Sequence, residues 1–184
     1  MIKSRLEELY KEKLRTQLQS SLGLSNIMEV PAVSKIVLNV GAKEAVKDSK
    51  YLGLVERSLE KISGQKPVRT LARKSIAGFK IREGMPLGVK VTLRGSAMYH
   101  FLDRLINIAL PTVRDFQGIS RKFDRRGSYN LGVTESTIFP EVESMSAGDV
   151  TFGLNITIVT TASNDAQAFE LLKSFGMPFK KEQK

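Results

Sequence analysis

The sequence predicts an α+β fold, a two-layer domain with helices on one face of a mostly antiparallel sheet and the other face open. Several segments alternate apolar and polar residues with a period of two, as half-buried strands do. Between them lie segments with apolar residues every three or four positions, the pattern of amphipathic helices. The length of 184 residues and the charged fraction of 26% are typical of a single folded domain, here residues 1–184.

The first third of the chain predicts two helices with a strand between them. Residues 2–22 carry leucines at helical spacing, and residues 49–63 carry a second apolar stripe. Between these helices, residues 33–41 predict a strand with Asn39 on its polar face. The amide of Asn39 could contact a ribose or a base edge, or it could hydrogen-bond a neighbouring strand or turn.

Positive charge is concentrated in residues 64–94, which hold eight Lys or Arg and one acid, a net +7 within a chain of net charge +10. Residues 127–179 are acidic, with one base and six acids. A basic strand face is often only a solvated surface. Charge segregated this strongly nevertheless indicates a polyanionic partner on one side of the molecule.

Two strands in the basic region supply the predicted binding face. Residues 68–72 predict a strand with Arg69 on its polar face. Residues 89–94 predict a second strand, because apolar Val89, Val91 and Leu93 alternate with Lys90, Thr92 and Arg94. The open face is therefore predicted to display Asn39, Arg69, Lys90, Thr92 and Arg94, a composition that suits phosphates and riboses.

Residues 73–86 predict a protruding, hairpin-like loop, because Gly and Pro interrupt a run of cations there. Phe79 and Ile81 lie between these cations. Both side chains could tuck back into the core, or Phe79 near the tip could stack on a splayed base.

The second half of the chain predicts two more helices and several extended segments. One helix spans residues 96–109, beginning at Ser96 and stopped by Pro111, and a last helix is capped by Ser163 or Asn164. The extended segments are residues 112–116, 137–140 and 150–160. Residues 120–132 predict a mobile basic loop within a longer loop over about 116–148, and long charged loops are often contact surfaces.

The sequence offers no convincing catalytic or metal site. It has one histidine, His100, and no cysteine, which excludes thiol catalysis, disulfides and Cys-based zinc sites. The acids Glu141, Glu143 and Asp149 are interpreted as solvated carboxylates rather than as a Mg²⁺ or acid–base site. We therefore expect no enzymatic activity, no cofactor and no metal. An RNA-modifying or nuclease enzyme is the rival hypothesis, and it would require a close-set carboxylate cluster.

Membranes and duplex DNA are disfavoured as partners. No apolar run approaches the ~20 residues that span a bilayer, and the first residues lack the apolar core of a secretion signal. We expect a cytoplasmic location. The cations fall on strands and loops rather than along one helix face, which favours structured RNA over duplex DNA. A generic nucleic-acid chaperone or duplex-DNA binder, the second alternative, would bind RNA and DNA of equal length alike.

Long stretches of the sequence resemble one protein family. The stretches are VSKIVLNVG, ISGQKP, ARKSIAGFKIREGMPLGVKVTLRG, RLINIALPTVRDFQGIS, GSYNLGV and IFPE, in the family's order over nearly the whole chain. This is the bacterial large-subunit ribosomal protein L5 family, whose members bind 5S rRNA. The resemblance implies a sheet of about five strands whose concave face docks on 5S rRNA in the central protuberance, and hence a ribosomal location in the cytoplasm.

The resemblance also implies site residues and partners. The residues matching the family's 5S rRNA contacts are Asn39, Gln65, Thr92 and Arg94, to which the basic face adds Lys66, Arg69 and Lys90. The loop residues implied to contact peptidyl-site tRNA are Arg73, Lys74, Ser75, Phe79, Lys80 and Arg82. Residues 116–143 are implied to face a small-subunit head protein in an intersubunit bridge, with predicted contacts at Arg114, Arg121, Arg125 and Arg126. Further implied partners are 23S-type large-subunit rRNA and other 5S-binding and central-protuberance ribosomal proteins.

Overall fold

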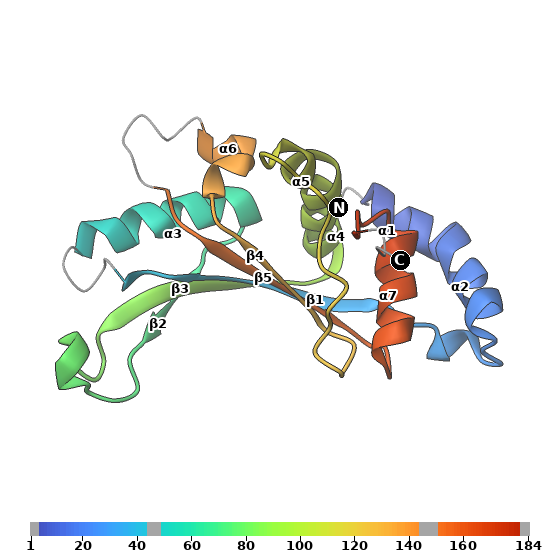
Figure 1. The fold of residues 1–184 in the computed structure, drawn as a ribbon, viewed down its shortest axis with the longest axis horizontal. Helices are drawn as coiled ribbons and strands as arrows, with labels where there is room; N and C mark the ends of the chain where they lie inside the picture. The colour runs from blue at the N-terminus through green and yellow to red at the C-terminus, as the bar shows by residue number, and fades with distance from the viewer. Residues whose placement is uncertain (1–3, 44–48, 144–150, 181–184) are drawn as a thin grey trace. The chain divides into compact units, whose positions relative to one another are not determined.

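The structure is a computed structural model that describes residues 4–43, 49–143 and 151–180 (Figure 1). The chain divides into two compact units. Unit 1 comprises Met1–Ile36, Leu93–Leu131 and Thr157–Lys184, and unit 2 comprises Val37–Thr92 and Gly132–Ile156.

One antiparallel sheet of five strands confirms the predicted α+β class. Its strands, in spatial order, are β2 (Val68–Leu71), β3 (Pro86–Leu93), β1 (Val33–Gly41), β5 (Leu154–Thr160) and β4 (Tyr129–Val133). All of these strands except β2 contain residues of both units. We therefore propose that the two units fold as one domain, because a shared strand cannot unfold in one unit without loss of its hydrogen bonds in the other.

Burial along the strands follows the predicted alternation. In β1, Ile36, Leu38 and Val40 are buried, and the residues between them are only partly buried. In β3 the buried residues include Val89, Val91 and Leu93, and in β5 they include Leu154, Ile156 and Ile158. One face of the sheet therefore belongs to the core, and the period-two pattern identified that face correctly.

In unit 2 the core face is covered by α3 (Ser49–Ser63) and α6 (Pro140–Glu143), which contact each other and lie on the same side of the strands in Figure 1. The helix α3 confirms the second predicted helix. Its buried stripe consists of Leu52, Val55, Leu59 and Ile62, at the spacing of one helical face. Gly64 ends it with a left-handed φ of 67°, which glycine adopts without strain.

In unit 1 the core is formed by three groups of helices. The first runs through α1 (Arg5–Leu9), the π-helical turn η1 (Tyr10–Leu14) and α2 (Arg15–Leu22), confirming the predicted N-terminal helix over its described part. The second runs through α4 (Gly95–Arg104), the π-helical turn η5 (Leu105–Ala109) and α5 (Leu110–Thr112), and the third is α7 (Asp165–Ser174). The rings of Tyr10 and Phe175 stack with centroids 5.8 Å apart, and the Tyr10 hydroxyl donates to the Pro31 carbonyl at 3.0 Å.

Both predicted ends of the helix over residues 96–109 are wrong. Arg94 occupies the N-cap position, and the Ser96 hydroxyl instead donates to the Glu7 carboxylate at 3.2 Å. Pro111 does not stop the helix, which continues to Thr112. A proline inside a regular α-helix clashes with the carbonyl four residues earlier. Here the Leu110 N–H bonds the carbonyl of Leu105, five residues back, so a widened turn directly precedes the proline.

The elements predicted after α5 differ from those in the structure. Residues 112–116 do not form a strand, and Asp115 has a left-handed φ of 52°. Residues 137–140 do not form an extended segment either. Only Phe139 is extended, between η6 (Ser136–Ile138) and the start of α6, where Pro140 is favoured as a first helical residue. Conversely, β4 and α6 lie within the stretch 116–148 that the sequence predicts as one loop, of which residues 144–148 are outside the described part.

The last strand and helix agree with expectation. The strand predicted over 150–160 is observed as β5, which begins only at Leu154: residues 151–153 are not part of the strand, and Val150 lies outside the described residues. Of the two candidate caps of α7, Asn164 is the N-cap: its side-chain oxygen accepts from the Gln167 N–H at 2.9 Å. The Gln167 side chain accepts from the Ser163 N–H at 3.1 Å, one residue before the N-cap, so the pair resembles a capping box with the return bond shifted by one residue.

Candidate nucleic-acid interface

The uncovered face of the sheet in unit 2 carries three of the seven residues predicted to bind 5S rRNA. Lys90 is exposed on β3, and Thr92 and Asn39 are partly buried on β3 and β1. All three alternate with residues that are fully buried on the core face, so their side chains project from the uncovered side. Arg94, which belongs to unit 1, follows β3 and is exposed. Gln65 and Lys66 are exposed in the turn after α3.

Arg69 does not belong to this face, and its predicted placement there is wrong. In the antiparallel pairing of β2 with β3, Arg69 is opposite Val89 and Val68 is opposite Lys90. Directly opposed residues point to the same side of a sheet, so Arg69 points to the side of α3. There its guanidinium donates to the Glu56 carboxylate at 2.7 and 2.9 Å. Val68, 61% exposed, takes the place on the open face.

Gly88 on β3 allows the backbone of β1 to approach closely. A Cβ at this position would lie 2.5 Å from the Val40 carbonyl oxygen and 2.9 Å from the Thr70 hydroxyl oxygen. The first neighbour is backbone and cannot rotate away, whereas the second is a side chain. Glycine at this position therefore permits the observed spacing of β1 and β3, the two strands that carry Asn39, Lys90 and Thr92.

We predict that Gly88→Ala destabilises the protein by about 1–3 kcal/mol, the usual cost of forcing an extra carbon into a packed site. Urea unfolding followed by circular dichroism measures the change. Gly78→Ala is the matched control, because a Cβ there meets no atom within 4 Å and the backbone is not left-handed. Equal stability of the two variants would contradict the close approach at Gly88.

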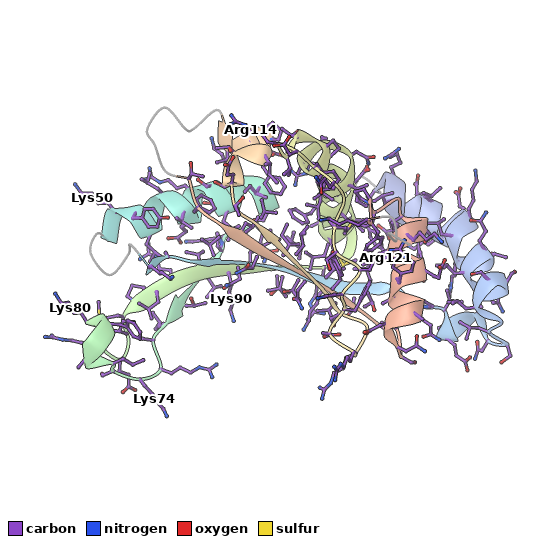
Figure 2. All side chains as sticks on the ribbon, viewed as in Figure 1. Lys50, Lys74, Lys80, Lys90, Arg114 and Arg121 are labelled. Atoms are coloured by element: carbon purple, nitrogen blue, oxygen red, sulfur yellow. The ribbon has the colours of Figure 1, made fainter. Side chains whose placement is uncertain are left out.

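The predicted tRNA-contacting loop lies between β2 and β3 and is exposed throughout its cationic positions. Figure 2 shows Lys74 and Lys80 projecting outward from it. An isolated bridge between Ile76 and Ile81 closes the tip, and Phe79 is 71% exposed. Phe79 is therefore not tucked into the core, which excludes one of the two alternatives for this side chain, and stacking on a base stays a prediction. The Ser75 hydroxyl accepts from the Glu83 N–H at 3.0 Å, while Arg73 and Arg82 are exposed.

The residues predicted for an intersubunit bridge fall in two places in unit 1. Arg114 is exposed just after α5, and Arg121, Arg125 and Arg126 are exposed in the segment before β4. Figure 2 shows Arg114 and Arg121 well apart. The Arg121 guanidinium lies 5.2 Å from the centroid of the Phe169 ring, and its Nε donates to the Lys180 carbonyl at 2.9 Å. Arg121 is thus held against the protein surface.

Three further residues with hydroxyl or amide side chains, on β4 and β5, were not among the predicted site residues. The Thr157 hydroxyl on β5 donates to the Asn130 side-chain oxygen on β4 at 2.7 Å, and Asn155 on β5 is exposed. The alternation in β5 already placed Thr157 and Asn155 on a polar face. Asn130 has no such signal, because the sequence around it predicts a loop.

No feature of the described residues supports the rival enzymatic hypothesis. Within this part of the chain, no group of three or more His, Cys, Asp or Glu side chains could hold a metal ion. Asp149 and the side chain of Glu143 lie outside it. His100 is exposed on α4. Every helix of the described residues is too short or too polar to cross a lipid bilayer.

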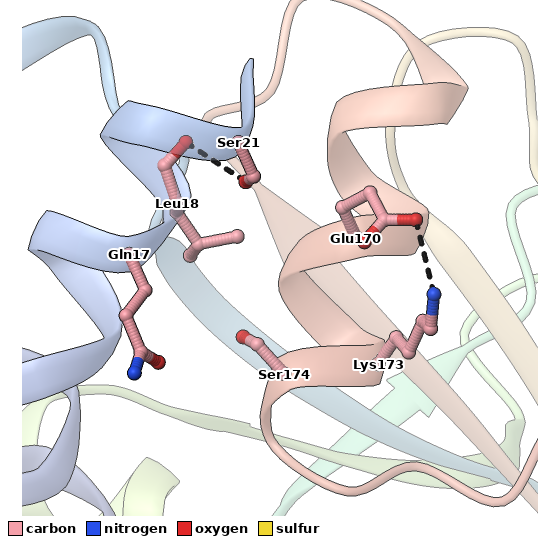
Figure 3. Close-up of a pocket in the computed structure, with 6 residues that line it drawn as sticks. All are labelled: Gln17, Leu18, Ser21, Glu170, Lys173 and Ser174. Atoms are coloured by element: carbon pink, nitrogen blue, oxygen red, sulfur yellow. Dashed lines mark hydrogen bonds and ion pairs between the residues drawn. The ribbon is translucent and has the colours of Figure 1, made fainter. Parts of the chain in front are cut away.

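A shallow depression between α2 and α7 has a volume of about 260 Å³ (Figure 3). It is lined by Gln17, Leu18, Ser21, Glu170, Lys173 and Ser174. Its charged residues pair with each other, with the Lys173 ammonium 3.4 Å from the Glu170 carboxylate. The Ser21 hydroxyl donates to the Leu18 carbonyl at 3.2 Å. The depression therefore presents no activated nucleophile or convergent set of polar groups.

Comparison with known proteins extends over both units. The family model described as "Ribosomal protein L5" matches residues 26–82, and a second model, which describes the C-terminus of the same ribosomal family, matches residues 86–179. The Large ribosomal subunit protein uL5 of Francisella tularensis subsp. mediasiatica is 54% identical over 178 residues, covering 96% of this chain and 99% of the relative. The protein of the same name from Francisella philomiragia is 53% identical over the same coverage. The chain therefore belongs to the ribosomal protein L5 family.

Proposed function

We propose that this protein is a structural constituent of the large ribosomal subunit and binds 5S rRNA through the open sheet face of unit 2. The observation that carries this proposal is the division of β3 into two chemically different faces. Val89, Val91 and Leu93 are at most 2% exposed, and Lys90, Thr92 and Arg94 occupy the intervening positions. The relatives' names as large ribosomal subunit proteins support the proposal.

Each side chain of this face has a suitable role in RNA binding. The ammonium of Lys90 and the guanidinium of Arg94 suit phosphates, since both donate charge-assisted hydrogen bonds. The Thr92 hydroxyl and the Asn39 amide can donate and accept, which suits 2′-hydroxyls and base edges. Exposed Gln65 and Lys66 extend the surface beyond α3. No aromatic residue lies among these positions, so contacts to phosphate and ribose dominate over stacking.

A salt-dependent titration against 5S rRNA and an unrelated structured RNA of equal length tests this function. We expect tight binding to 5S rRNA alone, with a modest dependence of affinity on salt. Equal binding to both RNAs with a steep salt dependence would contradict the proposal, because net charge alone produces that behaviour. Duplex DNA of the same length serves as the control for a generic nucleic-acid binder.

The basic loop and the residues before β4 complete the proposed function. We assign the loop to the peptidyl-site tRNA because its cations and the ring of Phe79 are all exposed on the β2–β3 connection. We assign Arg114, Arg121, Arg125 and Arg126 to an intersubunit bridge with a small-subunit head protein. The exposure of all four residues supports this assignment, as does the cation–π contact that orients Arg121. The remaining proposed partners are 23S-type rRNA and neighbouring central-protuberance proteins.

A further inference from the structure

The short 3₁₀ helix η2 (Ile27–Glu29) in unit 1 holds the side chain of Met28 out into solvent. Met28 is 77% exposed, more than any other exposed large hydrophobic residue of the described chain. The side-chain oxygen of Asn26 accepts from the Met28 N–H at 2.9 Å, and the Asn26 carbonyl accepts from the Glu29 N–H at 3.1 Å. These two bonds fix the backbone, so the thioether starts from a defined position on the surface.

A cation lies against the sulfur of Met28. The Arg15 guanidinium, at the start of α2, donates from Nη2 to Met28 Sδ at 3.0 Å and to the Ile27 carbonyl at 3.2 Å. Single exposed apolar side chains are normal on protein surfaces, but this contact sets Met28 apart from them. A thioether sulfur has two lone pairs. Arg15 engages one of them, which leaves the other open to a reagent from solvent.

The other described methionines are less accessible. Met98 and Met177 are 2% and 4% exposed. Met85 is partly buried, and its sulfur accepts from a backbone N–H at 3.2 Å. Two more methionines of the chain lie outside the described residues, Met1 and Met145. Among the described residues, Met28 therefore offers its sulfur most openly to a dissolved oxidant.

We propose that Met28 is a reversible oxidation site, at which a peroxide oxidises the sulfur and Arg15 directs the new oxygen to one side of it. The open lone pair attacks one oxygen of hydrogen peroxide, the O–O bond breaks and an S–O bond forms. The thioether loses two electrons and becomes a sulfoxide. The proton on the transferred oxygen moves to the departing hydroxide, so the peroxide is reduced to water. This modification goes beyond the proposed RNA-binding function.

The geometry determines which product forms. A sulfoxide is chiral at sulfur, and the two lone pairs of the thioether lead to opposite epimers. Because Arg15 covers one lone pair, the oxidised Met28 consists mainly of one epimer. Each of the two classes of methionine sulfoxide reductase acts on only one epimer. A single class of reductase therefore restores most of the oxidised Met28.

The fold tolerates a sulfoxide at this position. Oxidation makes an apolar side chain polar, which disrupts a packed core such as that around Met98. At Met28 the new oxygen faces water. The backbone bonds that hold η2 come from Asn26 and do not involve the sulfur.

The test treats the full chain with dilute hydrogen peroxide and follows each methionine by mass spectrometry of its proteolytic peptide. Met28 is expected to be oxidised at least about tenfold faster than Met98 and Met177, because access to the sulfur limits the reaction. Treating the peptides with each class of reductase in turn measures the two epimers. We expect one epimer at Met28 to exceed the other at least about fourfold, the scale of one hydrogen bond.

Two variants test the role of Arg15, and a third is the matched control. Arg15→Leu keeps an apolar stem but cannot donate to the sulfur, and Arg15→Ala removes the side chain altogether. Both are expected to yield nearly equal amounts of the two epimers at Met28. Lys13→Ala removes an exposed cation from the preceding turn and should keep the epimer excess of the wild type. Circular dichroism checks that each variant is folded.

Three results would overturn the proposal. The first is oxidation of Met28 no faster than that of Met98 and Met177, and the second is equal amounts of both epimers in the folded wild type. The third is an epimer excess that persists in the Arg15 variants, since another feature would then direct the oxygen. The first two measurements need no variant, so they decide the outcome even where a substitution prevents folding.

Discussion

Replacing Thr92 and Arg94 together by alanine is expected to weaken 5S rRNA binding at least about 30-fold without unfolding the protein. Each lost contact is worth about 1–3 kcal/mol on the scale of charged or buried hydrogen bonds, and 1.4 kcal/mol corresponds to a factor of ten in affinity. Stability should be nearly unchanged, because Arg94 is exposed and Thr92 projects from the uncovered face. Filter binding at constant salt measures the affinity, and thermal unfolding checks the fold.

The structure supplies a close control in Arg69→Ala. Arg69 and Arg94 are both arginines of the same basic region, but Arg69 points to the opposite side and pairs with Glu56 at 2.7 Å. The side chain of Arg69 is 54% exposed, so loss of this ion pair should lower the free energy of unfolding by less than about 1 kcal/mol. We expect Arg69→Ala to bind 5S rRNA as the wild type does. A loss as large as that of Arg94→Ala would show that the sheet faces are assigned in reverse.

Removing the tip of the basic loop, Ser75–Arg82, and joining its ends by a short glycine linker is the second change with a large expected effect. We expect the affinity of variant ribosomes for peptidyl-site tRNA to fall about tenfold, since Lys80, Arg82 and the exposed ring of Phe79 are lost together. The fold should survive the deletion. The base of the loop is closed separately by two hydrogen bonds of Ala72. Its N–H donates to the Met85 carbonyl at 2.8 Å, and its carbonyl accepts from the Gly84 N–H at 3.0 Å.

The same deletion should leave 5S rRNA binding within about twofold of the wild type, because the tip lies outside the open face. A large loss of 5S affinity would refute the separation of the two RNA contacts. Lys80→Asn provides a milder companion variant, since it removes one charge while Asn accepts the left-handed φ of 55° at this position. A tRNA affinity intermediate between wild type and deletion is expected, measured by retention of labelled tRNA on the ribosome.

Periodic patterns in the sequence correctly predicted the long helices and strands that bury only one face. The leucine repeat before Gly23, the stripe of α3 and the alternation in β1, β3 and β5 all predicted the observed buried faces. A hydrophobic face must be covered by other parts of the protein. The spacing of apolar residues therefore indicates both whether a segment is a helix or a strand and which of its sides is buried. The same patterns placed Asn39, Lys90 and Thr92 on the open face.

Patterns failed where a long-range contact decides the conformation. The strand β4 contains Asn130 and Gly132 at exposed positions, residues that locally favour turns, and it exists because it pairs with β5. The helix through Pro111 persists because a π-helical turn precedes the proline. Arg69 was misplaced because β2 is an edge strand, where both sides reach solvent and polarity does not identify the open face.

The fold class, the family and the concentration of positive charge in residues 64–94 can all be read from the amino-acid sequence, because they depend on composition, local period and long matching motifs. The folded structure is needed to establish which way Arg69 points, that Phe79 stays exposed and that Asp124 and Asp165 bind backbone N–H groups instead of pairing with Arg125 and Arg126. Those outcomes depend on strand register and on contacts between residues as far apart as 125 and 165. No local pattern encodes such contacts, because they form only when distant segments pack together.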